Sequence, residues 1–402
     1  MEVDQDVSAA RSSGRDVVLC INSGSSSMKL AVIAVGDGEE RTIARAAVEG
    51  IGGGQARSWL RVGDERTEDD AACTTHPAAL DHALALLADC EVGDLDRVSV
   101  IGHRLAHGGP DHVEPVLVDE AVVASLRKVI PLAPLHLPAA IAAVEAVRAR
   151  YPSLPQVLCF DTAFHASMPE VARRLPIPDR FAEAGVRRYG FHGLSYEYVM
   201  SVLGEGRPSR IVIAHLGNGA SLVAVSDGRS IDTTMGLTPT GGVIMGTRTG
   251  DLDPGVLIHL EREHRMSTDD VQRVVDREGG LRAVGGTSDM VTLLERAKTD
   301  PRARLAVAMF GYSVRKAIGA LAAALGGIDL LVFTGGIGEH AAVVRAEACR
   351  GLDAFGIALD PEKNERGEEL LAAPGSRCIV RVIATDEDVV IARHAHRLCR
   401  RA

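Results

Sequence analysis

Short apolar runs that end in polar or glycine-rich residues recur along the chain and predict buried β-strands followed by turns. The run at 17–21 (VVLCI) breaks at polar residues 22–27 and then resumes as MKLAVIAV, which is the pattern of a β-hairpin. The stretch at 211–228 (IVIAHLGNGASLVAVSDG) has the same layout. The two stretches differ too much to be a sequence repeat, but their shared layout predicts two domains of one architecture.

The rest of the chain alternates between strand and helix patterns. Helical spacing of apolar residues predicts helices at 77–90, 119–129 and 137–150, and hairpin strands are expected within 36–75. Further strands are expected in RVSVIGHRLAHGG (97–109), QVLCFDTAFH (156–165) and LLVFTGGIGEH (330–340), the last ending in a glycine turn before a helix. Helices should fill 254–325 with an interruption at GGLRAVGGTSD (279–289), and 381–398 should form a strand and then a helix. This alternation predicts an α/β fold with mixed sheets and ligands at the carboxyl ends of strands.

The composition excludes some classes of function. Fifty-four acidic residues against 44 basic ones give a formal net charge of −10, which speaks against a nucleic-acid-binding protein. The seven cysteines form no CxxC pair, so we expect reduced thiols and no structural zinc site. Residues 1–16 lack the apolar core of a signal peptide, and no segment approaches the length of a transmembrane helix. We therefore expect a soluble cytoplasmic protein with a disordered leader at 1–16.

Glycine clusters mark three strand ends, at Gly24, at Gly217 and Gly219, and at Gly335, Gly336 and Gly338. None of them matches the Walker phosphate loop or the Rossmann dinucleotide motif. Backbone amides exposed in such turns can nevertheless bind phosphate oxygens. A single glycine turn is usually structural. Three of them, the first followed by hydroxyl residues 25–27 and by Lys29, favour a phosphate-binding protein.

Two arginines and one histidine lie unusually close to glycines. Arg104 (GHRLAHGG) and Arg248 (GTRTGDLDP) carry guanidinium groups, which bind carboxylates and phosphates in a bidentate manner. The alternative is a buried ion pair, in the case of Arg248 with Asp251 or Asp253. His192 lies between glycines in YGFHGLSY and is the best histidine candidate for contact with a transferring group.

Two carboxylates follow or begin predicted elements. Asp161 comes directly after the strand VLCF, and Glu387 begins the last helix. Magnesium that is bound together with a nucleotide needs only one or two protein oxygen ligands, so isolated carboxylates of this kind are sufficient for a metal site. For Glu387 the alternative is a simple stabilising charge at a helix N-terminus.

Nine segments together resemble the acetate kinase family, in the family's order and over nearly all of the chain beyond the leader. They are INSGSSSMKL, GHRLAHGG, FDTAFH, RYGFHG, HLGNGAS, TMGLTP, MGTRTGDLDP, FTGGIGEH and TDEDVVIA. The resemblance implies the acetate and sugar kinase/Hsc70/actin fold, with ribonuclease-H-like domains at 17–164 plus 387–402 and at 165–386, the active site in the cleft between them, and a homodimer. It also implies reversible transfer of the γ-phosphoryl group of ATP to acetate, giving acetyl phosphate and ADP, with Mg²⁺ or alternatively Mn²⁺ as the metal.

The resemblance further assigns a role to each matching residue. The metal ligands would be Asn22 and Glu387. The catalytic residues would be Asp161, which acts at the metal, and His192 and Arg248, which stabilise the transition state. The substrate would contact Arg104 through its carboxylate, and Ala106, Leu135, Phe191 and Pro239 through its apolar part. The ATP phosphates would face Lys29, His215, Leu216, Gly217, Asn218 and Gly219. Adenosine would contact Asp289, Met290, Val291, Gly336, Ile337, Gly338, Glu339 and His340.

The chain departs from the family pattern at four positions. Tyr196 stands where a second histidine usually follows FHG, and Val291 replaces the usual arginine near adenosine. His340 and Leu137 each stand where the family often has asparagine. These changes bear on nucleotide affinity and base preference, and they leave the phosphoryl-transfer residues intact.

The chemistry of the implied reaction agrees with these residues. A carboxylate is ionised at neutral pH and needs no general base, whereas a sugar hydroxyl would need one. Two arginines, a histidine and Mg²⁺ would offset the repulsion between two anions. The alternatives are a propionate kinase of the same family, a sugar kinase and a non-catalytic actin-like nucleotide switch. Because Ala106 stands where many acetate kinases carry valine, we expect propionate to be accepted as well.

Overall fold

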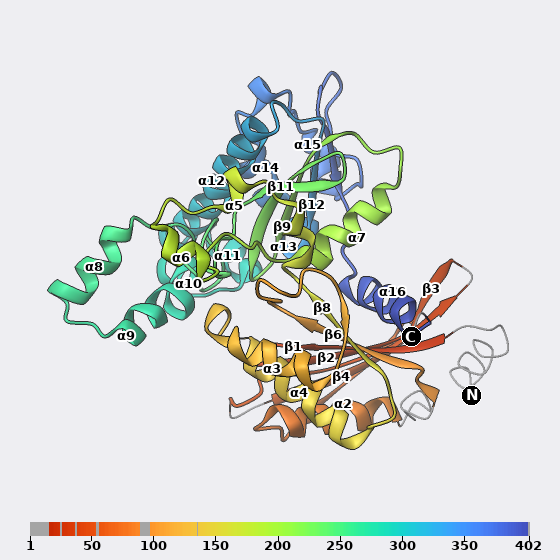
Figure 1. Ribbon diagram of the computed structural model, residues 1–402. Coiled ribbons are helices and arrows are strands. Elements are labelled where there is room, and N and C mark those ends of the chain that lie inside the picture. The colour runs from red at the N-terminus through yellow and green to blue at the C-terminus, as the bar shows by residue number, and fades with distance from the viewer. Residues whose placement is uncertain are drawn as a thin grey trace. The chain divides into compact units, whose positions relative to one another are not determined.

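The computed structural model describes residues 16–24, 26–36, 38–53, 56–88, 97–134 and 136–400. The chain forms two compact units, Met1–Ala163 with Asp386–Ala402, and Phe164–Thr385, named here the N-terminal unit and the C-terminal unit. Each unit has its own sheet and its own hydrophobic core (Figure 1). Most of the leader expected at 1–16, and Leu135, lie outside the described residues.

The N-terminal unit is built on an eight-stranded sheet in the order β5-β4-β3-β2-β1-β6-β8-β7. Its strands are β1 (Asp16–Ser23), β2 (Ser27–Gly36), β3 (Glu39–Glu49), β4 (Ala56–Val62), β5 (Glu65–Ala71), β6 (Val100–Leu105), β7 (Val116–Leu117) and β8 (Gln156–Phe160). Its helices are α2 (His76–Ala88), α3 (Glu120–Lys128), η2 (Ile130–Leu132), α4 (Leu137–Arg150) and α16 (Glu387–Cys399). The predicted hairpin strands and the predicted helices of this part of the chain are confirmed.

Both faces of the central strands in the N-terminal unit are covered by helices. On one face Leu19 of β1 lies in a hydrophobic cluster with Leu80 of α2 and Val147 of α4. On the other face α16 packs against β1 and β6. A Cβ atom added to Gly102 of β6 would lie 2.3 Å from Cγ2 of Ile391, so only glycine permits this close approach of the helix. Helix α16 therefore covers a face of the sheet whose strands lie far from it in the sequence.

The C-terminal unit is built on a five-stranded sheet in the order β11-β10-β9-β12-β13. Its strands are β9 (Arg210–Leu216), β10 (Ala220–Ser226), β11 (Arg229–Thr233), β12 (Leu330–Thr334) and β13 (Ile379–Val382). Its helical segments are η3 (Ala163–Ser167), α5 (Glu170–Arg173), α6 (Asp179–Glu183), α7 (Gly193–Leu203), α8 (Pro254–Glu263), α9 (Thr268–Arg273), η4 (Val274–Glu278), α10 (Gly280–Gly285), α11 (Met290–Arg296), α12 (Pro301–Ala324), α13 (Gly335–His340), α14 (Ala342–Cys349), η5 (Asp353–Phe355) and α15 (Pro361–Arg366).

Helices also cover both faces of this second sheet. On one face Phe333 of β12 shares a hydrophobic cluster with Phe310 of α12. On the opposite face Val332 of the same strand shares a cluster with Tyr196 and Val199 of α7. Alternate residues of β12 thus enter different cores, as the period of a strand requires.

Five strands of the N-terminal sheet share the topology of the C-terminal sheet. In each, three strands that pair antiparallel are followed by two parallel strands, in the orders β3-β2-β1-β6-β8 and β11-β10-β9-β12-β13. The predicted α/β class, the mixed sheets and the shared architecture of the two domains are therefore confirmed.

Two glycine-rich segments that we expected to be non-helical contain helix. Gly335–His340 forms α13 directly after β12, and Gly280–Gly285 forms α10. Each helix begins at a glycine with positive φ, 75° at Gly335 and 62° at Gly280. Glycine adopts this conformation without steric cost, so the helix can begin within the glycine-rich segment.

Helix α12 corrects the expectation that no segment approaches transmembrane length. Among the described helices, only this one of 24 residues is long and apolar enough to cross a membrane by length and composition. Its buried residues, among them Phe310, Val314 and Ile318, belong to the core of the C-terminal unit. A core helix of a folded domain passes the same test of length and hydropathy.

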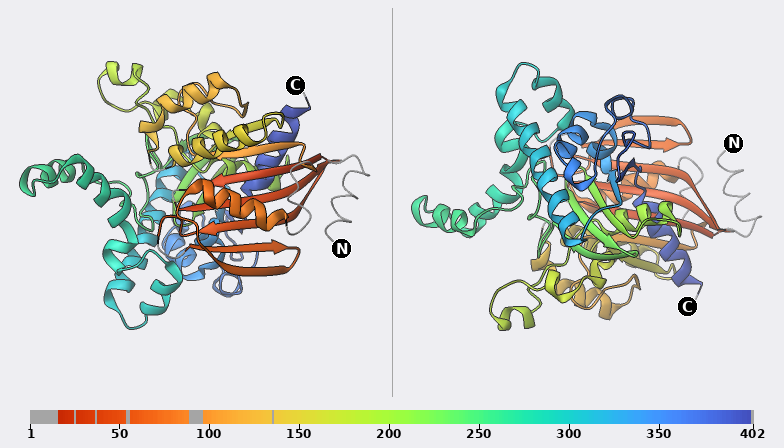
Figure 2. Two further views of the ribbon diagram at one scale, coloured as in Figure 1. Left: turned by 90° about the horizontal axis from the view of Figure 1, so that it is seen from below. Right: turned by 90° about the horizontal axis from the view of Figure 1, so that it is seen from above.

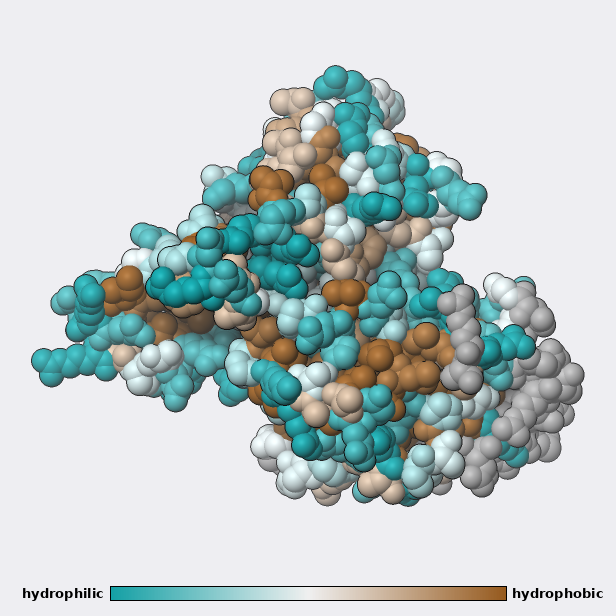
Figure 3. Space-filling view, in the orientation of Figure 1, coloured by the Kyte–Doolittle hydropathy of each residue, from teal (hydrophilic) through white to brown (hydrophobic). Residues whose placement is uncertain are grey.

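Helices α8 and α9 project from the body of the C-terminal unit in every view (Figure 2). No residue of α8 is buried. Its Val256, Leu257 and Ile258, and Leu252 just before it, are exposed large hydrophobic side chains. Apolar surface is visible along this projection in the space-filling view (Figure 3).

Candidate functional site

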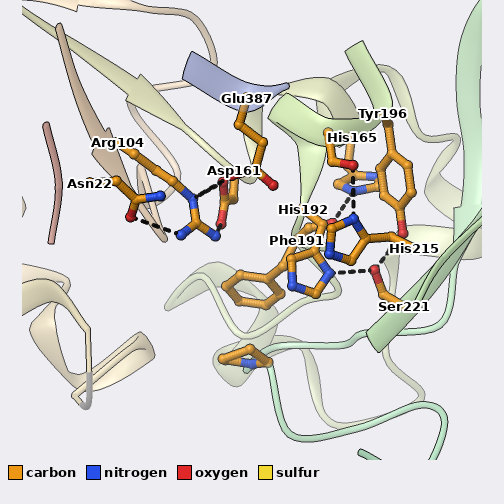
Figure 4. Close-up of polar contacts among 12 residues, drawn as sticks. Asn22, Arg104, Asp161, His165, Phe191, His192, Tyr196, His215, Ser221 and Glu387 are labelled. Atoms are coloured by element: carbon orange, nitrogen blue, oxygen red, sulfur yellow. Dashed lines mark hydrogen bonds and ion pairs between the residues drawn. The ribbon is translucent and has the colours of Figure 1, made fainter. Parts of the chain in front are cut away.

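Three oxygen-bearing side chains of the N-terminal unit surround the guanidinium group of Arg104 (Figure 4). Its Nε and Nη2 donate to Oδ1 and Oδ2 of Asp161 at 3.0 and 2.7 Å. Its Nη1 donates to Oδ1 of Asn22 at 3.1 Å. Oε2 of Glu387 lies 3.3 Å from Nε. Four of the predicted site residues thus lie together in this unit.

The parallel strands of the sheet explain how these residues meet. Arg104, near the end of β6, is the register partner of Asn22 on β1 and of Cys159 on β8. Asp161 follows β8 directly. The carboxyl ends of adjacent parallel strands lie at one edge of a sheet, so polar residues placed at these ends gather there. Lys29 is the register partner of Asn22 on β2, and its side chain is exposed.

Glu387 joins this edge as the first residue of α16. The N-cap of that helix is Asp386, whose Oδ1 accepts a hydrogen bond from the N–H of Val389 at 3.4 Å. The capping role therefore belongs to Asp386, and Glu387 is turned to Arg104 instead. Burial, followed by the nearby charge of Asp386, raises the pKa of Asp388 to about 6.

The charge balance of this cluster suits a hard cation. Burial of the guanidinium opposes its charge, but Asp161 and Glu387 outweigh this effect and raise the pKa of Arg104 above its ordinary value. The carboxylates and the amide oxygen of Asn22 are ligands of the kind that Mg²⁺ prefers. In the part of the chain that the structure describes, no three His, Cys, Asp or Glu side chains form a metal-binding group. Mg²⁺ bound with a nucleotide takes only one or two protein ligands, so the residues present fit this ion.

In the C-terminal unit, the glycine-rich turn after β9 faces two histidines and an arginine. A Cβ atom added to Gly219 would lie 3.3 Å from Nε2 of His192 and 3.4 Å from Nη1 of Arg248. One added to Gly217 would lie 3.7 Å from Nε2 of His215. The two histidine rings stack, with centroids 4.3 Å apart. Nitrogen atoms that can donate hydrogen bonds therefore converge on this turn, an arrangement suited to an anion.

Hydroxyl groups hold both histidine rings by their Nδ1 atoms (Figure 4). Oγ of Ser195 lies 2.8 Å from Nδ1 of His215, and Oγ of Ser221 lies 2.9 Å from Nδ1 of His192. The hydroxyl of Tyr196 is hydrogen-bonded to the same Ser221 Oγ. His192 itself has a left-handed backbone with φ of 59° at the N-cap of α7, which is uncommon for a residue other than glycine.

The loop that carries Arg248 contacts the same glycine turn. The N–H of Gly246 donates to the carbonyl oxygen of Asn218 at 3.0 Å. Nη1 of Arg248 donates to the carbonyl oxygen of Pro239 at 3.1 Å. Residues 215–219 and 246–248, which are separated by a hairpin in the sequence, thus form one surface in this unit.

The two acids that could have paired with Arg248 have other roles. Oδ1 of Asp251 accepts from the N–H of Gly242 at 2.7 Å. Asp253 is the N-cap of α8 and accepts from the N–H of Gly255 at 2.9 Å. Both carboxylates therefore stabilise the backbone of this loop and of the helix that follows it.

The segment Gly335–His340 lies beside the glycine turn after β9. Thr334, which ends β12, is the register partner of His215 on β9. A Cβ atom added to Gly335 would lie 2.8 Å from the carbonyl oxygen of Leu216, so the two backbones are in contact. Helix α13 includes Gly336, Ile337, Gly338, Glu339 and His340. Oε1 of Glu339 accepts from the N–H of Gly335 at 2.9 Å and closes the turn.

The residues expected near adenosine differ in exposure. Asp289 is the N-cap of α11, and hydrogen bonds from the side chain and the backbone of Thr292 lower its pKa. Met290 is only 5% exposed and belongs to the hydrophobic core. Val291 is 67% exposed, and the side chain of His340 is 83% exposed.

The residues expected around the apolar part of the substrate are half-buried or buried. Ala106, two residues after Arg104, packs at the margin of a hydrophobic cluster in the N-terminal unit. Phe191 is 2% exposed in the core of the C-terminal unit, and Pro239 is half-buried there. Leu135 lies outside the described residues.

The sequence did not predict the residues that hold the two histidines and helix α13 in place. Ser195 and Ser221 hold the histidines, and Arg345, which is 1% exposed, donates to the carbonyl oxygens of Gly338 and Glu339 at 2.9 and 2.8 Å. For Ser221, the sequence feature that could have indicated such a role is a polar residue within an otherwise apolar strand. Ser221 interrupts the strand Ala220–Ser226, and hydroxyls at such positions usually have a specific partner.

Comparison with known proteins agrees with this geometry. The profile of the Acetokinase family matches residues 17–393. The chain is 44% identical to an acetate kinase of Rhodopseudomonas palustris, over 95% of this chain and 98% of that protein. It is 40% identical to an acetate kinase of a Sulfurovum species, over 94% and 97%.

Solved structures of similar proteins lead to the same family. The crystal structure of Porphyromonas gingivalis acetate kinase has a TM-score of 0.85 at 37% identity, and covers 95% of this chain and 99% of its own. The crystal structure of a propionate kinase from Francisella tularensis has a TM-score of 0.89 at 32% identity, with the same coverage. With the profile match over nearly its whole length, the chain belongs to the acetokinase family.

Proposed function

We propose that this protein is an acetate kinase, which transfers the γ-phosphoryl group of ATP reversibly and directly to acetate and forms acetyl phosphate and ADP. Apart from the family, one observation carries the proposal. In the C-terminal unit Nε2 of His192 and Nη1 of Arg248 lie next to the same glycine, Gly219. Phosphoryl transfer depends mainly on positioning and on neutralising charge, and this group of donors provides both functions for a phosphoryl group.

The N-terminal unit would supply the carboxylate site and the metal site. Arg104 would bind the acetate carboxylate, and Asn22, Asp161 and Glu387 would hold Mg²⁺. When bound, the metal neutralises phosphate charge and orients the phosphate chain. Arg104 makes a bidentate contact with Asp161, and the same guanidinium donors would bind the substrate carboxylate. No general base is required because acetate is ionised at neutral pH.

Nucleotide binding would belong to the C-terminal unit. The turn His215–Gly219 and the segment Gly336–His340 meet at the ends of adjacent parallel strands, where α/β folds usually bind ligands. Lys29 would contribute a positive charge toward the phosphates from the N-terminal unit. A cytoplasmic location is proposed as well. Among the described residues the cysteines form no disulfide, which is compatible with a reducing compartment.

A hydroxylamine trap tests the proposed reaction. The protein is incubated with ATP, Mg²⁺ and acetate, and acetyl phosphate is captured as the hydroxamate. Hydroxamate should form only when all three components are present. If acetate, propionate and butyrate all yield none, the proposal fails, and a sugar kinase or a nucleotide switch has to be considered again.

Propionate should be accepted with a kcat/KM within about two orders of magnitude of that for acetate, because one methylene discriminates by only about 1–3 kcal/mol. Ala106 has two carbon atoms fewer than the valine expected from the resemblance, which would leave room for this methylene. The variant Ala106→Val should lower kcat/KM for propionate about tenfold and change that for acetate by less than about threefold. The same trap, with the carboxylate varied, gives both constants. A propionate value several hundredfold below acetate in the parent protein would contradict this prediction.

We also propose that the protein forms a homodimer through the projecting helices α8 and α9. Leu252, Val256, Leu257 and Ile258 expose apolar surface on this projection, and such patches on soluble proteins mark contact sites. Sedimentation equilibrium should give twice the chain mass, and Leu257→Glu combined with Ile258→Glu should give the single chain mass. An unchanged mass in this variant would exclude α8 from the contact.

A further inference from the structure

Tyr196 and Ser221 form a hydrogen-bonded path that ends at His192. Tyr196 is fully buried in α7, and its hydroxyl is bonded to Oγ of Ser221 on β10. The same Oγ lies 2.9 Å from Nδ1 of His192. Ser221 is the register partner of His215 in the hairpin of β9 and β10, so the sheet fixes its position beside the stacked histidine rings.

The acidities of the groups set the direction of these hydrogen bonds. A phenol is a stronger acid than an aliphatic alcohol, so Tyr196 is the natural donor to Ser221. Ser221 has a single proton, which it then donates to Nδ1 of His192. A neutral imidazole that accepts at Nδ1 carries its own proton on Nε2.

We propose that Tyr196 and Ser221 act as positioning residues that fix His192 as the neutral tautomer protonated at Nε2. This inference rests on the proposed function only for its effect on rate. Nε2 faces the glycine turn, 3.3 Å from the Cβ position of Gly219 and beside Arg248. A proton on Nε2 lets His192 donate to a phosphoryl oxygen without adding a positive charge beside the stacked ring of His215.

His192 has a left-handed backbone with φ of 59° at the N-cap of α7, which is uncommon for a residue other than glycine. The hydrogen bond from Ser221 to its Nδ1 determines which ring nitrogen carries the proton. In the other tautomer a lone pair on Nε2 would face the same place and would repel a phosphoryl oxygen. Tyr196 also stands where the resemblance leads us to expect a histidine, so the path is a feature of this chain.

The tautomer can be measured without any reaction. In protein labelled with ¹⁵N at histidine, the His192 signals are those that disappear in His192→Asn. At neutral pH the parent should show Nε2 protonated and Nδ1 unprotonated. Tyr196→Phe should move a measurable fraction of the proton to Nδ1. A parent with the proton on Nδ1, or an unchanged pattern in Tyr196→Phe, would overturn the proposal.

Steady-state kinetics of the variants provide a second, independent test of the proposal. Tyr196→Phe should lower kcat about tenfold and leave both KM values within about threefold. Ser221→Ala should lower kcat at least as much. Because the two residues act in series, the double variant should match Ser221→Ala within about twofold. Tyr198→Phe, a half-buried tyrosine on the same helix, is the matched control and should retain the parental kcat.

These measurements separate the two proposals. If the kcat losses of the two single variants multiply in the double variant, the path is refuted. If the tautomer shifts in Tyr196→Phe as expected while kcat stays at the parental value, the path is upheld and the role of His192 in the reaction is refuted. If the parent shows the expected tautomer but forms no hydroxamate from any carboxylate, the path again holds and the proposed reaction fails.

Discussion

Arg248→Ala is expected to lower kcat for hydroxamate formation by about 10³-fold, which corresponds to about 4 kcal/mol of barrier. The guanidinium of Arg248 lies beside the glycine turn, next to Nε2 of His192 and anchored on the carbonyl of Pro239. An arginine that contacts a phosphoryl group in transfer stabilises the transition state far more than the bound substrates. Both KM values should therefore change little, and steady-state kinetics with ATP and acetate varied in turn will show this split.

The control for this experiment is an arginine of the same unit on the surface. Arg273 pairs with Asp270 and Glu278 in an exposed position, and Arg273→Ala should keep kcat within about twofold because such pairs contribute little. Circular dichroism of both variants should match the parent, since Arg248 is only half-buried. If kcat of Arg248→Ala stays within about tenfold of the parent, the transition-state role is excluded.

Arg104→Ala should lower kcat/KM for acetate by about 10³-fold, with most of the loss in the KM for acetate. The guanidinium is the proposed binding group for the substrate carboxylate. It is also the cation that faces Asp161 and Glu387, so its removal leaves two carboxylates close together. Arg104→Lys keeps a charge but loses the bidentate geometry. We expect it to lie between the parent and the alanine variant.

Arg150→Ala is the matched control in the N-terminal unit. Arg150 pairs with Asp81 at an exposed site, and its loss should leave the KM for acetate unchanged. The KM for ATP should rise much less in Arg104→Ala than the KM for acetate. Equal increases in both constants would show that Arg104 does not select the carboxylate and acts on the structure of the unit instead.

The strand layout made much of the fold predictable. Apolar runs that end in glycine predicted the hairpins of both sheets. The similar layout of these runs predicted two domains of one architecture, and the sheets share the topology of five strands. The wrong predictions concern glycine-rich segments, which can form either a turn or the start of a helix. Gly335 and Gly280 have positive φ and begin helices α13 and α10, whereas the sequence alone suggests a longer turn. The prediction that no segment approaches the length of a transmembrane helix was also wrong, because α12 has 24 residues. Helical spacing of apolar residues does not show where a helix ends.

The candidate site was partly predictable for a similar reason. Arg104, Asp161 and Asn22 follow or end predicted strands. The structure shows that these strands are parallel neighbours, whose ends gather at one edge of the sheet. The supporting hydroxyls were not predictable. Ser221 and His192 are 29 residues apart in the sequence, and no local sequence pattern predicts a contact between them. The sequence marked Tyr196 only as a departure from the family's usual histidine. The structure shows that its hydroxyl is hydrogen-bonded to Ser221 where α7 packs on the sheet.

The closing helix α16 has a consequence for the order in which the protein is made on the ribosome. Residues 164–385 are continuous, so the C-terminal unit can fold as soon as they have emerged. The N-terminal sheet, although synthesised first, must wait for residues 387–399 before Ile391 covers Gly102 and Glu387 reaches Arg104. A chain released before this helix would have one finished unit and an uncovered sheet. The proposed metal site can therefore form only after Glu387 has been synthesised.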